Sequence, residues 1–249
     1  MRRALLMGLA IWVIAGSAWT DGEPWKSKPY QQWDEKDVAT VLQLSPWAKV
    51  NLPIVGAWHP SGAEAADTST LGVAGSGTDT SNRSNGARTN QPGGTEKQAA
   101  AGTQMYNVFW WSSRTIREAS ARRAVLKGAT TQEAADKMVS APVNTYQILI
   151  NSPNMAIFQQ RGEAAFKQAA FIQLHKSKQK LSPTEVKFQT NPDGRVVGAV
   201  FSFAKNGANG QPTISSDEKE IDFNVRIGDS WLRTYFNPKQ MVDSQGEDL

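Results

Sequence analysis

A long stretch with almost no large apolar side chain divides this sequence into two parts. From residue 59 to residue 103 the chain is rich in Gly, Ser, Thr, Asn and Ala, and Leu71 and Val73 are the main exceptions. Such a segment buries too little apolar surface to offset the conformational entropy that is lost on ordering. The composition therefore predicts a disordered linker at 59–103, with a folded core built from the flanking sequence.

The first 18 residues have the pattern of a cleavable signal peptide. Arg2 and Arg3 give a positive start, and residues 4–15 are all apolar or Gly. This run is shorter than the roughly 20 residues that span a bilayer. Gly16 and Ala18 place small residues before a cut after Ala18. We expect a periplasmic or extracellular protein, and an uncleaved membrane anchor is the alternative.

Composition limits the chemistry that is available. The chain has no Cys, which excludes disulfides, thiolate metal sites and a Cys nucleophile. Its only imidazoles are His59 and His175, so we expect no metal centre rich in His, while an all-oxygen cation site stays open. Removal of Arg2 and Arg3 lowers the net charge from +4 to about +2, which argues against nucleic-acid binding. We expect no cofactor and no stable membrane span after signal cleavage.

Residues 19–58 are rich in Trp and contain one well-marked helix. Asp34 suits an N-cap, Trp33 before it supplies an apolar staple, and Pro46 ends the helix near Leu44. A helix this short is not stable alone, so its apolar face needs a partner surface. Either this Trp-rich arm docks on the core domain, or it binds another molecule.

Residues 104–242 carry mixed helix and strand patterns, and 243–249 form a polar tail. A capping box at Thr115 and Glu118 predicts a helix over 116–127. A second helix is predicted to follow it and to end at about residue 139, and a third is predicted over 155–167. The predicted strands are 106–112, 145–150, 169–176, 186–190, 195–204, 221–227 and 231–236. Helices early and strands late predict an α+β domain with a largely antiparallel sheet and two to three helices.

Several of these features occur together in a known group of proteins. They are Trp33 with its helix, the string Ser45-Pro46-Trp47-Ala48-Lys49, the strand and Arg/Ala-rich helix of 106–127, and a closing hairpin with Phe223 and residues 236–241. In these the chain resembles uncharacterised exported bacterial proteins, some of which are labelled as having a GWxTD-type domain. That string is absent, and Trp19-Thr20-Asp21 is the nearest approach to it. The resemblance implies export and fold organisation, and it brings no catalytic residues.

Four tryptophans are the candidate interaction residues. Trp33 and Trp47 lie in the arm, where they pack on the core domain or meet an external partner. Trp110 and Trp111 are adjacent on a predicted strand and therefore point to opposite faces. One of the two enters the core, and the other is covered by a helix or borders a ligand groove.

An acidic cluster is the main candidate for catalysis, since paired carboxylates serve hydrolysis or bind Ca²⁺. It consists of Asp217, Glu218, Glu220 and Asp222. Glu220 and Asp222 alternate with apolar residues, which favours a solvated strand face instead. Ser177-Lys178-Gln179-Lys180 matches S-x-x-K but lacks the S-D-N and K-T-G partners of that chemistry.

Together these features predict an exported, non-enzymatic interaction or structural module of the cell envelope. Its partner is an unknown envelope protein or polymer. Two alternatives remain: an envelope-polymer hydrolase that uses the carboxylates near 217–222, and a small-ligand binder with a groove near Trp110 and Trp111.

The signal peptide gives the first testable prediction. If cleavage follows Ala18, N-terminal sequencing of the exported protein will return Trp19-Thr20-Asp21 as the first three residues. An exported protein that still begins at Met1-Arg2-Arg3 would show that the segment is retained.

Overall fold

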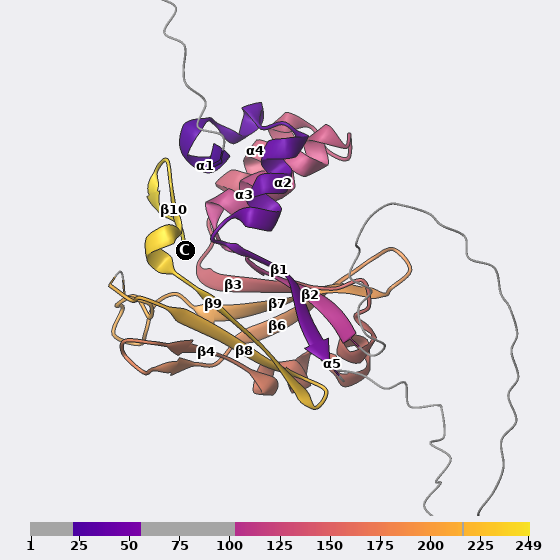
Figure 1. Ribbon diagram of the computed structural model, residues 1–249, viewed down its shortest axis with the longest axis vertical. Coiled ribbons are helices and arrows are strands. Elements are labelled where there is room, and N and C mark those ends of the chain that lie inside the picture. Colours follow the sequence, from indigo (N-terminus) through magenta and orange to yellow (C-terminus); the bar gives the residue numbers. More distant parts are fainter. Residues whose placement is uncertain (1–21, 56–102, 216) are drawn as a thin grey trace, which may run out of the picture.

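The computed structural model describes residues 22–55, 103–215 and 217–249 (Figure 1). The signal peptide predicted at 1–18 lies outside the described residues. So does the linker predicted at 59–103, apart from Thr103, which begins a strand.

Helices gather at one end of the molecule (Figure 1). The short α1 and the longer α2, α3 and α4 lie together there, and α5 lies beside the sheets. The bounds of the helices are α1 Pro24–Ser27, η1 Tyr30–Gln32, α2 Glu35–Leu44, α3 Arg114–Leu126, α4 Gln132–Ser140, α5 Ala156–Ala169 and η2 Pro238–Gln240.

Within the described ranges, the strands form three antiparallel sheets. A five-stranded sheet has the order β1-β2-β3-β7-β6, a four-stranded sheet the order β5-β4-β8-β9, and β10 pairs with β11. The bounds are β1 Ala48–Val55, β2 Thr103–Trp110, β3 Thr145–Asn151, β4 Ala170–Leu174, β5 Lys180–Leu181, β6 Glu185–Thr190, β7 Val196–Ala204, β8 Ile221–Ile227, β9 Ser230–Phe236, β10 Val242–Asp243 and β11 Gly246–Glu247. The predicted α+β class with largely antiparallel sheets is confirmed.

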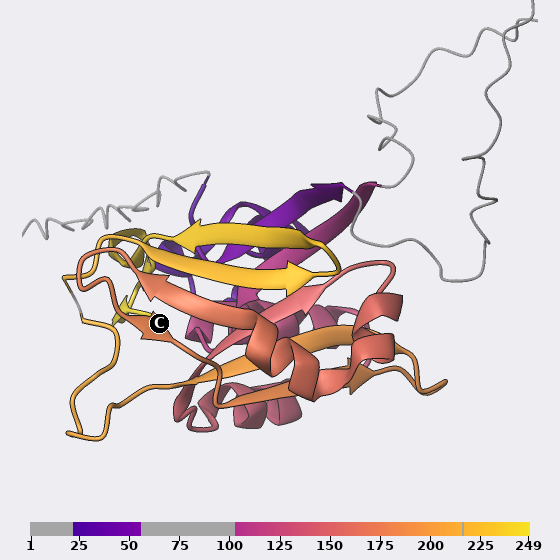
Figure 2. The same ribbon diagram turned by 90° about the horizontal axis from the view of Figure 1, so that it is seen from below.

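The core lies between the two large sheets, which Figure 2 shows as separate layers. Aromatic rings join the layers: Phe201 and Phe223 have ring centroids 5.5 Å apart, and Trp110 lies 5.2 Å from Phe236. All four side chains are fully buried. Because side chains alternate along a strand, the residues next to these inward-facing ones on each strand point to the outer face of their sheet.

The Trp-rich arm is part of this core. Helix α2 begins at the expected cap, because the Asp34 carboxylate accepts a hydrogen bond from Asp37 N and the Asp37 carboxylate accepts one from Asp34 N. The helix packs on α3, and β1 pairs with β2. Trp33 is 1% exposed and Trp47 is fully buried. The described part of the arm therefore docks intramolecularly, which was one of the two alternatives.

Strand β1 has no counterpart among the strands predicted from the sequence. Its pairing with β2 shifts register between Lys49 and Leu52, and Asn51 in the bulge has φ 56°. Asn is one of the few residues that tolerate this left-handed region. Pro53 lacks an N–H, which an edge strand tolerates and a central strand does not. The bulge and the proline hide the strand from a periodicity argument.

Two helices, α3 and α5, differ in detail from the predictions. The capping box expected at Thr115 and Glu118 is absent, because Ser113 Oγ accepts the hydrogen bond from Ile116 N and α3 starts at Arg114. Helix α5 bends where Gly162 has φ 76°, a conformation that glycine adopts without steric cost. Its stacked Phe158 and Phe166 rings still reach the core, with centroids 4.0 Å apart.

The C-terminal segment is not the free polar tail that its composition predicts. Residues 243–249 form part of the β10–β11 hairpin and return to the start of α3. Asp243 and Asp248 are buried, and hydrogen bonds from the start of α3 compensate their charge. These partners lie more than a hundred residues earlier in the chain. Such distant pairing leaves no local signal in the sequence.

Burial of the arm predicts a large stability effect at Trp33. We expect Trp33→Ala to lower the free energy of unfolding by about 3–5 kcal/mol, because it removes a fully packed indole and leaves a cavity. Leu44→Ala on the same segment is the control, since Leu44 is 77% exposed and its loss costs little. Equal urea midpoints for both variants would contradict the docked arrangement.

Candidate functional site

Three of the four candidate tryptophans are unavailable to a ligand in this conformation. Trp33, Trp47 and Trp110 are buried to 1% exposure or less. Trp111, just after β2, is only partly buried and borders a groove. The structure thus separates the adjacent pair as the alternation predicts, with Trp110 in the core and Trp111 outside it.

The groove beside Trp111 has a volume of about 520 Å³, which lies within the range of small-molecule sites. It runs between the outer face of the five-stranded sheet and helices α2 and α3. Five of its side chains are apolar: Leu42, Val50, Phe109, Trp111 and Leu149. The others are Gln43, Asn51, Asn107, Ser120, Arg123, Asn151 and Gln189.

Strand pairing fixes the floor of the groove. Phe109 is paired with Leu149 across β2 and β3, and Asn107 with Asn151 in the next outward-facing row. Phe109 is 8% exposed and Leu149 is 4% exposed. The floor is therefore a rigid apolar pair flanked by a pair of carboxamides.

Some of the carboxamides hold one another in place. Asn107 Nδ2 donates to Asn151 Oδ1 at 3.0 Å, and Asn51 N donates to Asn107 Oδ1 at 2.9 Å. The side chains of Gln43 and Gln189 are exposed and make no hydrogen bond to any described residue. Each therefore offers both a donor and an acceptor to a bound molecule.

Gly198 on β7 keeps one wall of the groove tight. A Cβ at this position would lie 2.9 Å from Gln189 Oε1 and 3.0 Å from Leu149 Cδ1. The contact with Gln189 is closer than real Cβ atoms show and the contact with Leu149 is tight, so a larger residue would shift these two groove side chains. A glycine here brings the amide of Gln189 next to the apolar floor.

A larger cavity, of about 860 Å³, lies at the start of α3, and two of the arginines that line it are bound to other parts of the fold. Arg117 Nη1 donates to Val139 O at 2.8 Å and to Ala141 O at 2.9 Å. Arg114 forms an ion pair with Asp243 at 2.6 Å. A ligand here would have to displace contacts that hold the fold together, so we regard the cavity as structural.

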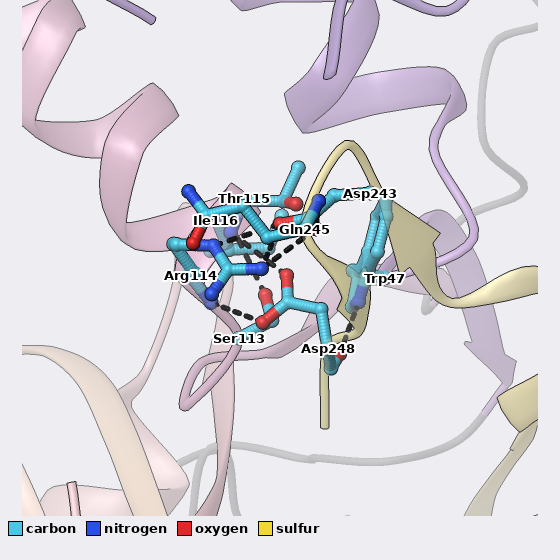
Figure 3. A network of polar contacts seen from close by, with 8 residues as sticks. All are labelled: Trp47, Ser113, Arg114, Thr115, Ile116, Asp243, Gln245 and Asp248. Atoms are coloured by element: carbon cyan, nitrogen blue, oxygen red, sulfur yellow. Dashed lines mark hydrogen bonds and ion pairs between the residues drawn. The ribbon is translucent and has the colours of Figure 1, made fainter. Parts of the chain in front are cut away.

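Figure 3 shows the network behind that cavity. The Arg114 guanidinium donates to both carboxylate oxygens of Asp243, with Nε–Oδ2 at 2.8 Å. Asp248 accepts hydrogen bonds from Arg114 N at 2.6 Å and Thr115 N at 2.9 Å. Its carbonyl oxygen accepts one from Trp47 Nε1 at 2.6 Å. Asp248 thereby caps α3 from the far end of the chain.

Glu118 adds a third carboxyl group to this region. Burial raises its pKa to about 7; the charge of Arg114 opposes the rise, and the carboxylates Asp243 and Asp248 add to it. Burial also raises the pKa of Asp248, although the two N–H groups of α3 favour its ionised form. The network therefore holds more carboxyl groups than its arginines neutralise near pH 7.

The acidic cluster predicted at 217–222 does not converge on a cavity. Asp217 is exposed and forms an ion pair with Lys176, which lowers the Asp217 pKa. Glu218 is 1% exposed and its carboxylate accepts a hydrogen bond from Lys176 N, so it departs from the expected solvated face. None of the four carboxylates lines the groove beside Trp111.

The other two acidic residues lie next to His175 on the outer face of the four-stranded sheet. His175 Nδ1 is 4.0 Å from Glu220 Oε1, and one ligand atom each of His175, Glu220 and Asp222 fall within 4.8 Å of one another. The imidazole is 57% exposed. Surface groups at this spacing are common without a metal, and nothing else in the described surroundings points to a bound ion.

Comparisons with known proteins give no relative. No protein-family model matches the sequence, and no curated protein or solved structure shows significant similarity to it. The resemblance to exported proteins of the GWxTD type stays a prediction. Among the described residues, no helix combines the length and apolar character needed to cross a bilayer.

Sequence reasoning found Trp111 but missed the rest of the groove. The lining residues come from α2, β1, β2, α3, β3 and β6, so no local motif unites them. Neutral carboxamides also lack the charge signature by which catalytic or metal-binding residues stand out. The one available signal was the outward position of Asn107 and Asn151 between buried neighbours.

The raised pKa of Glu118 predicts a pH-dependent stability. The folded state favours the protonated form, so the contribution of this group is fully present below about pH 4.5 and is lost as the pH rises to about 7. Glu118→Gln keeps the shape without the charge. We expect it to raise the Tm by roughly 2–4 °C at pH 8, allowing for partial solvation, and to leave it unchanged at pH 4.5.

The matched control is Glu133→Gln on the exposed face of α4. Its effect on Tm should be small at both pH values, because surface ion pairs contribute little. A Glu118→Gln variant that is destabilised at pH 8 would contradict the raised pKa.

Proposed function

We propose that this chain is an exported, non-enzymatic binding module of the cell envelope, and that the groove beside Trp111 binds a segment of saccharide chain. The observation that carries the proposal is the composition of the groove. Among the described residues that line it, five are carboxamides and none is Asp, Glu, His or Lys. General acid–base catalysis requires such groups, and a nucleophilic Ser120 would need one of them as its base, so binding is the activity that this groove supports best.

A saccharide suits the groove for two reasons. Each carboxamide offers a donor and an acceptor, which matches the paired donor and acceptor character of a hydroxyl group. The exposed part of Trp111, beside the largely buried Phe109 and Leu149, supplies apolar surface against which the C–H face of a sugar ring can pack. Free Gln43 and Gln189 groups at the rim leave hydrogen-bonding capacity for a ligand.

Arg123 gives the groove a preference among saccharides. It is exposed and no described carboxylate lies within ion-pair distance of it. Among the described residues of the lining it is also the one charged side chain, so an acidic substituent on the sugar would meet a guanidinium without competition from them. A uronic acid or a lactyl ether on an envelope glycan has this chemistry.

Export supports the proposal independently of the groove. The pattern of residues 1–18 predicts passage across the inner membrane, which brings the protein to the compartment where envelope glycans lie. The hydrolase alternative is less well supported, because the carboxylates near 217–222 do not line the groove.

The test is calorimetric titration of the chain with three soluble probes: glycan strands prepared from peptidoglycan, alginate oligomers and neutral dextran. We expect binding to an acidic glycan. Trp111→Ala should weaken it at least tenfold, as is usual for a central aromatic contact. Arg123→Gln should weaken binding of acidic probes and leave any binding of dextran unchanged.

Trp231→Ala is the matched control, because Trp231 is an exposed tryptophan on the other sheet. It should leave glycan binding unchanged. The proposal fails if none of the three probes binds, or if Trp111→Ala and Trp231→Ala have equal effects. Release of new reducing ends during incubation would instead favour the hydrolase.

A further inference from the structure

The outer face of the four-stranded sheet exposes aromatic side chains. Trp231 is 42% exposed and Tyr235 57%, although both lie on a regular strand of a folded sheet. Their neighbours Leu232 and Phe236 point inward and are buried. Figure 2 shows this sheet, with β8 and β9 in yellow beside β4 in orange, as an outer layer of the molecule.

These aromatic groups form a continuous surface with the next strands. Phe171 on β4 is paired with Asn224 on β8, which is paired with Arg233 on β9. The rings of Phe171 and Trp231 meet edge to face with centroids 6.0 Å apart. Single exposed apolar residues are ordinary on a protein surface, whereas grouped aromatics on one sheet face mark an interaction site.

Cations lie over each of these rings. Lys180 Nζ is 4.5 Å from the centroid of the Phe171 ring, and Arg233 Cζ is 5.6 Å from that of Trp231. Lys49 Nζ, which reaches over from the half-buried Lys49 on β1 of the five-stranded sheet, lies 5.6 Å from the centroid of Tyr235. No described carboxylate lies within ion-pair distance of these three cations. We call Lys49, Phe171, Lys180, Trp231, Arg233 and Tyr235 the aromatic–cationic face.

Carboxylates lie at both ends of this sheet. Glu220 and Asp222 are at the start of β8, and Asp229 in the turn between β8 and β9 is 3.6 Å from the guanidinium of Arg226 near the end of β8. Trp231 and Arg233 follow that turn. The rings of Phe171 and Trp231 lie toward the β8–β9 turn, whereas Tyr235 is paired with Asp222, and Lys180 lies in the same row of the sheet.

We infer that the aromatic–cationic face docks peripherally on an anionic phospholipid bilayer. Tryptophan and tyrosine partition to the interface between water and hydrocarbon, where one part of the ring system is apolar and the other is hydrated. Lysine and arginine beside them bind lipid phosphates and respond to the negative surface potential. Apart from Lys49, the groups of this face stand on one sheet, so they reach a planar surface together.

Charge and ring geometry favour a bilayer over a polysaccharide at this face. Sugar stacking needs an open ring face, and here lysine and arginine side chains already lie over the rings. A phosphate headgroup has the opposite requirement, since it binds the cation and leaves the ring to contact the glycerol region. The inference is independent of the groove, which lies on the outer face of the other sheet.

The experiment is co-sedimentation with large unilamellar vesicles of phosphatidylcholine containing 30% phosphatidylglycerol, compared with phosphatidylcholine alone. Both the full chain and a chain that begins at Trp19 are measured, because the apolar run at 4–15 would itself bind vesicles. We expect both to bind the anionic vesicles, and binding of the chain that begins at Trp19 to weaken as salt is raised.

Variants assign the binding to the face. Lys180→Gln and Arg233→Gln should each weaken the partition coefficient of the chain that begins at Trp19 roughly fivefold, and Trp231→Ser should weaken it further. Lys187→Gln, an exposed lysine on the outer face of the five-stranded sheet, is the matched charge control and should have little effect. Circular dichroism and Tm confirm that each variant is folded.

Three results would overturn the inference: no binding to anionic vesicles by the chain that begins at Trp19, equal binding to neutral vesicles, or equal loss in the Lys187→Gln control. Binding to soluble alginate through this face, with none to vesicles, would assign it to an acidic polymer instead. Because the groove variant Trp111→Ala should leave vesicle binding intact, failure here is distinguishable from failure of the saccharide proposal.

Discussion

One aspartate, Asp248, joins three parts of the chain that are far apart in the sequence. Asp248 caps the first turn of α3 through two N–H groups, and its own carbonyl accepts from the indole of Trp47. The Trp-rich arm, the start of the helical layer and the C-terminal hairpin therefore meet at a single residue. Arg114 secures the same junction through Asp243. Since a buried charge without partners is strongly destabilising, these groups depend on one another, and the helical end of the molecule depends on them all.

The two large sheets divide the functional surfaces between them. Their inner faces are buried against each other through aromatic contacts such as Phe201 with Phe223. Only the outer faces, which point away from one another, are therefore accessible to a ligand. One outer face is covered in part by α2 and α3 and forms the amide-lined groove. The other is open and carries Trp231 and Tyr235. A module of this form could hold a glycan on one side while the opposite side rests on a membrane.

The fold class and most elements were predictable because they depend on local patterns. The cap at Asp34 and the alternation of β8 are examples of signals contained in a few neighbouring residues. Features that depend on distant partners were not predictable. Pro53 disguised an edge strand, and Asp248 has the composition of a solvated tail until its partners at the start of α3 are known. Trp111 marked the groove, but the neutral amides that line it come from five elements and form no motif.

The bulge and proline of β1 also determine how this molecule behaves toward copies of itself. An open sheet edge is a template to which a strand of another chain can add, and this is a common route to aggregation. Strand β1 forms one edge of the five-stranded sheet, and there the kink at Asn51 and the missing N–H of Pro53 interrupt the ladder that an incoming strand would need. At the opposite edge, β6 carries two charged residues of opposite sign, Glu185 and Lys187, on its outer face. Both edges are thus protected against intermolecular strand addition, which suits a protein that folds without disulfides.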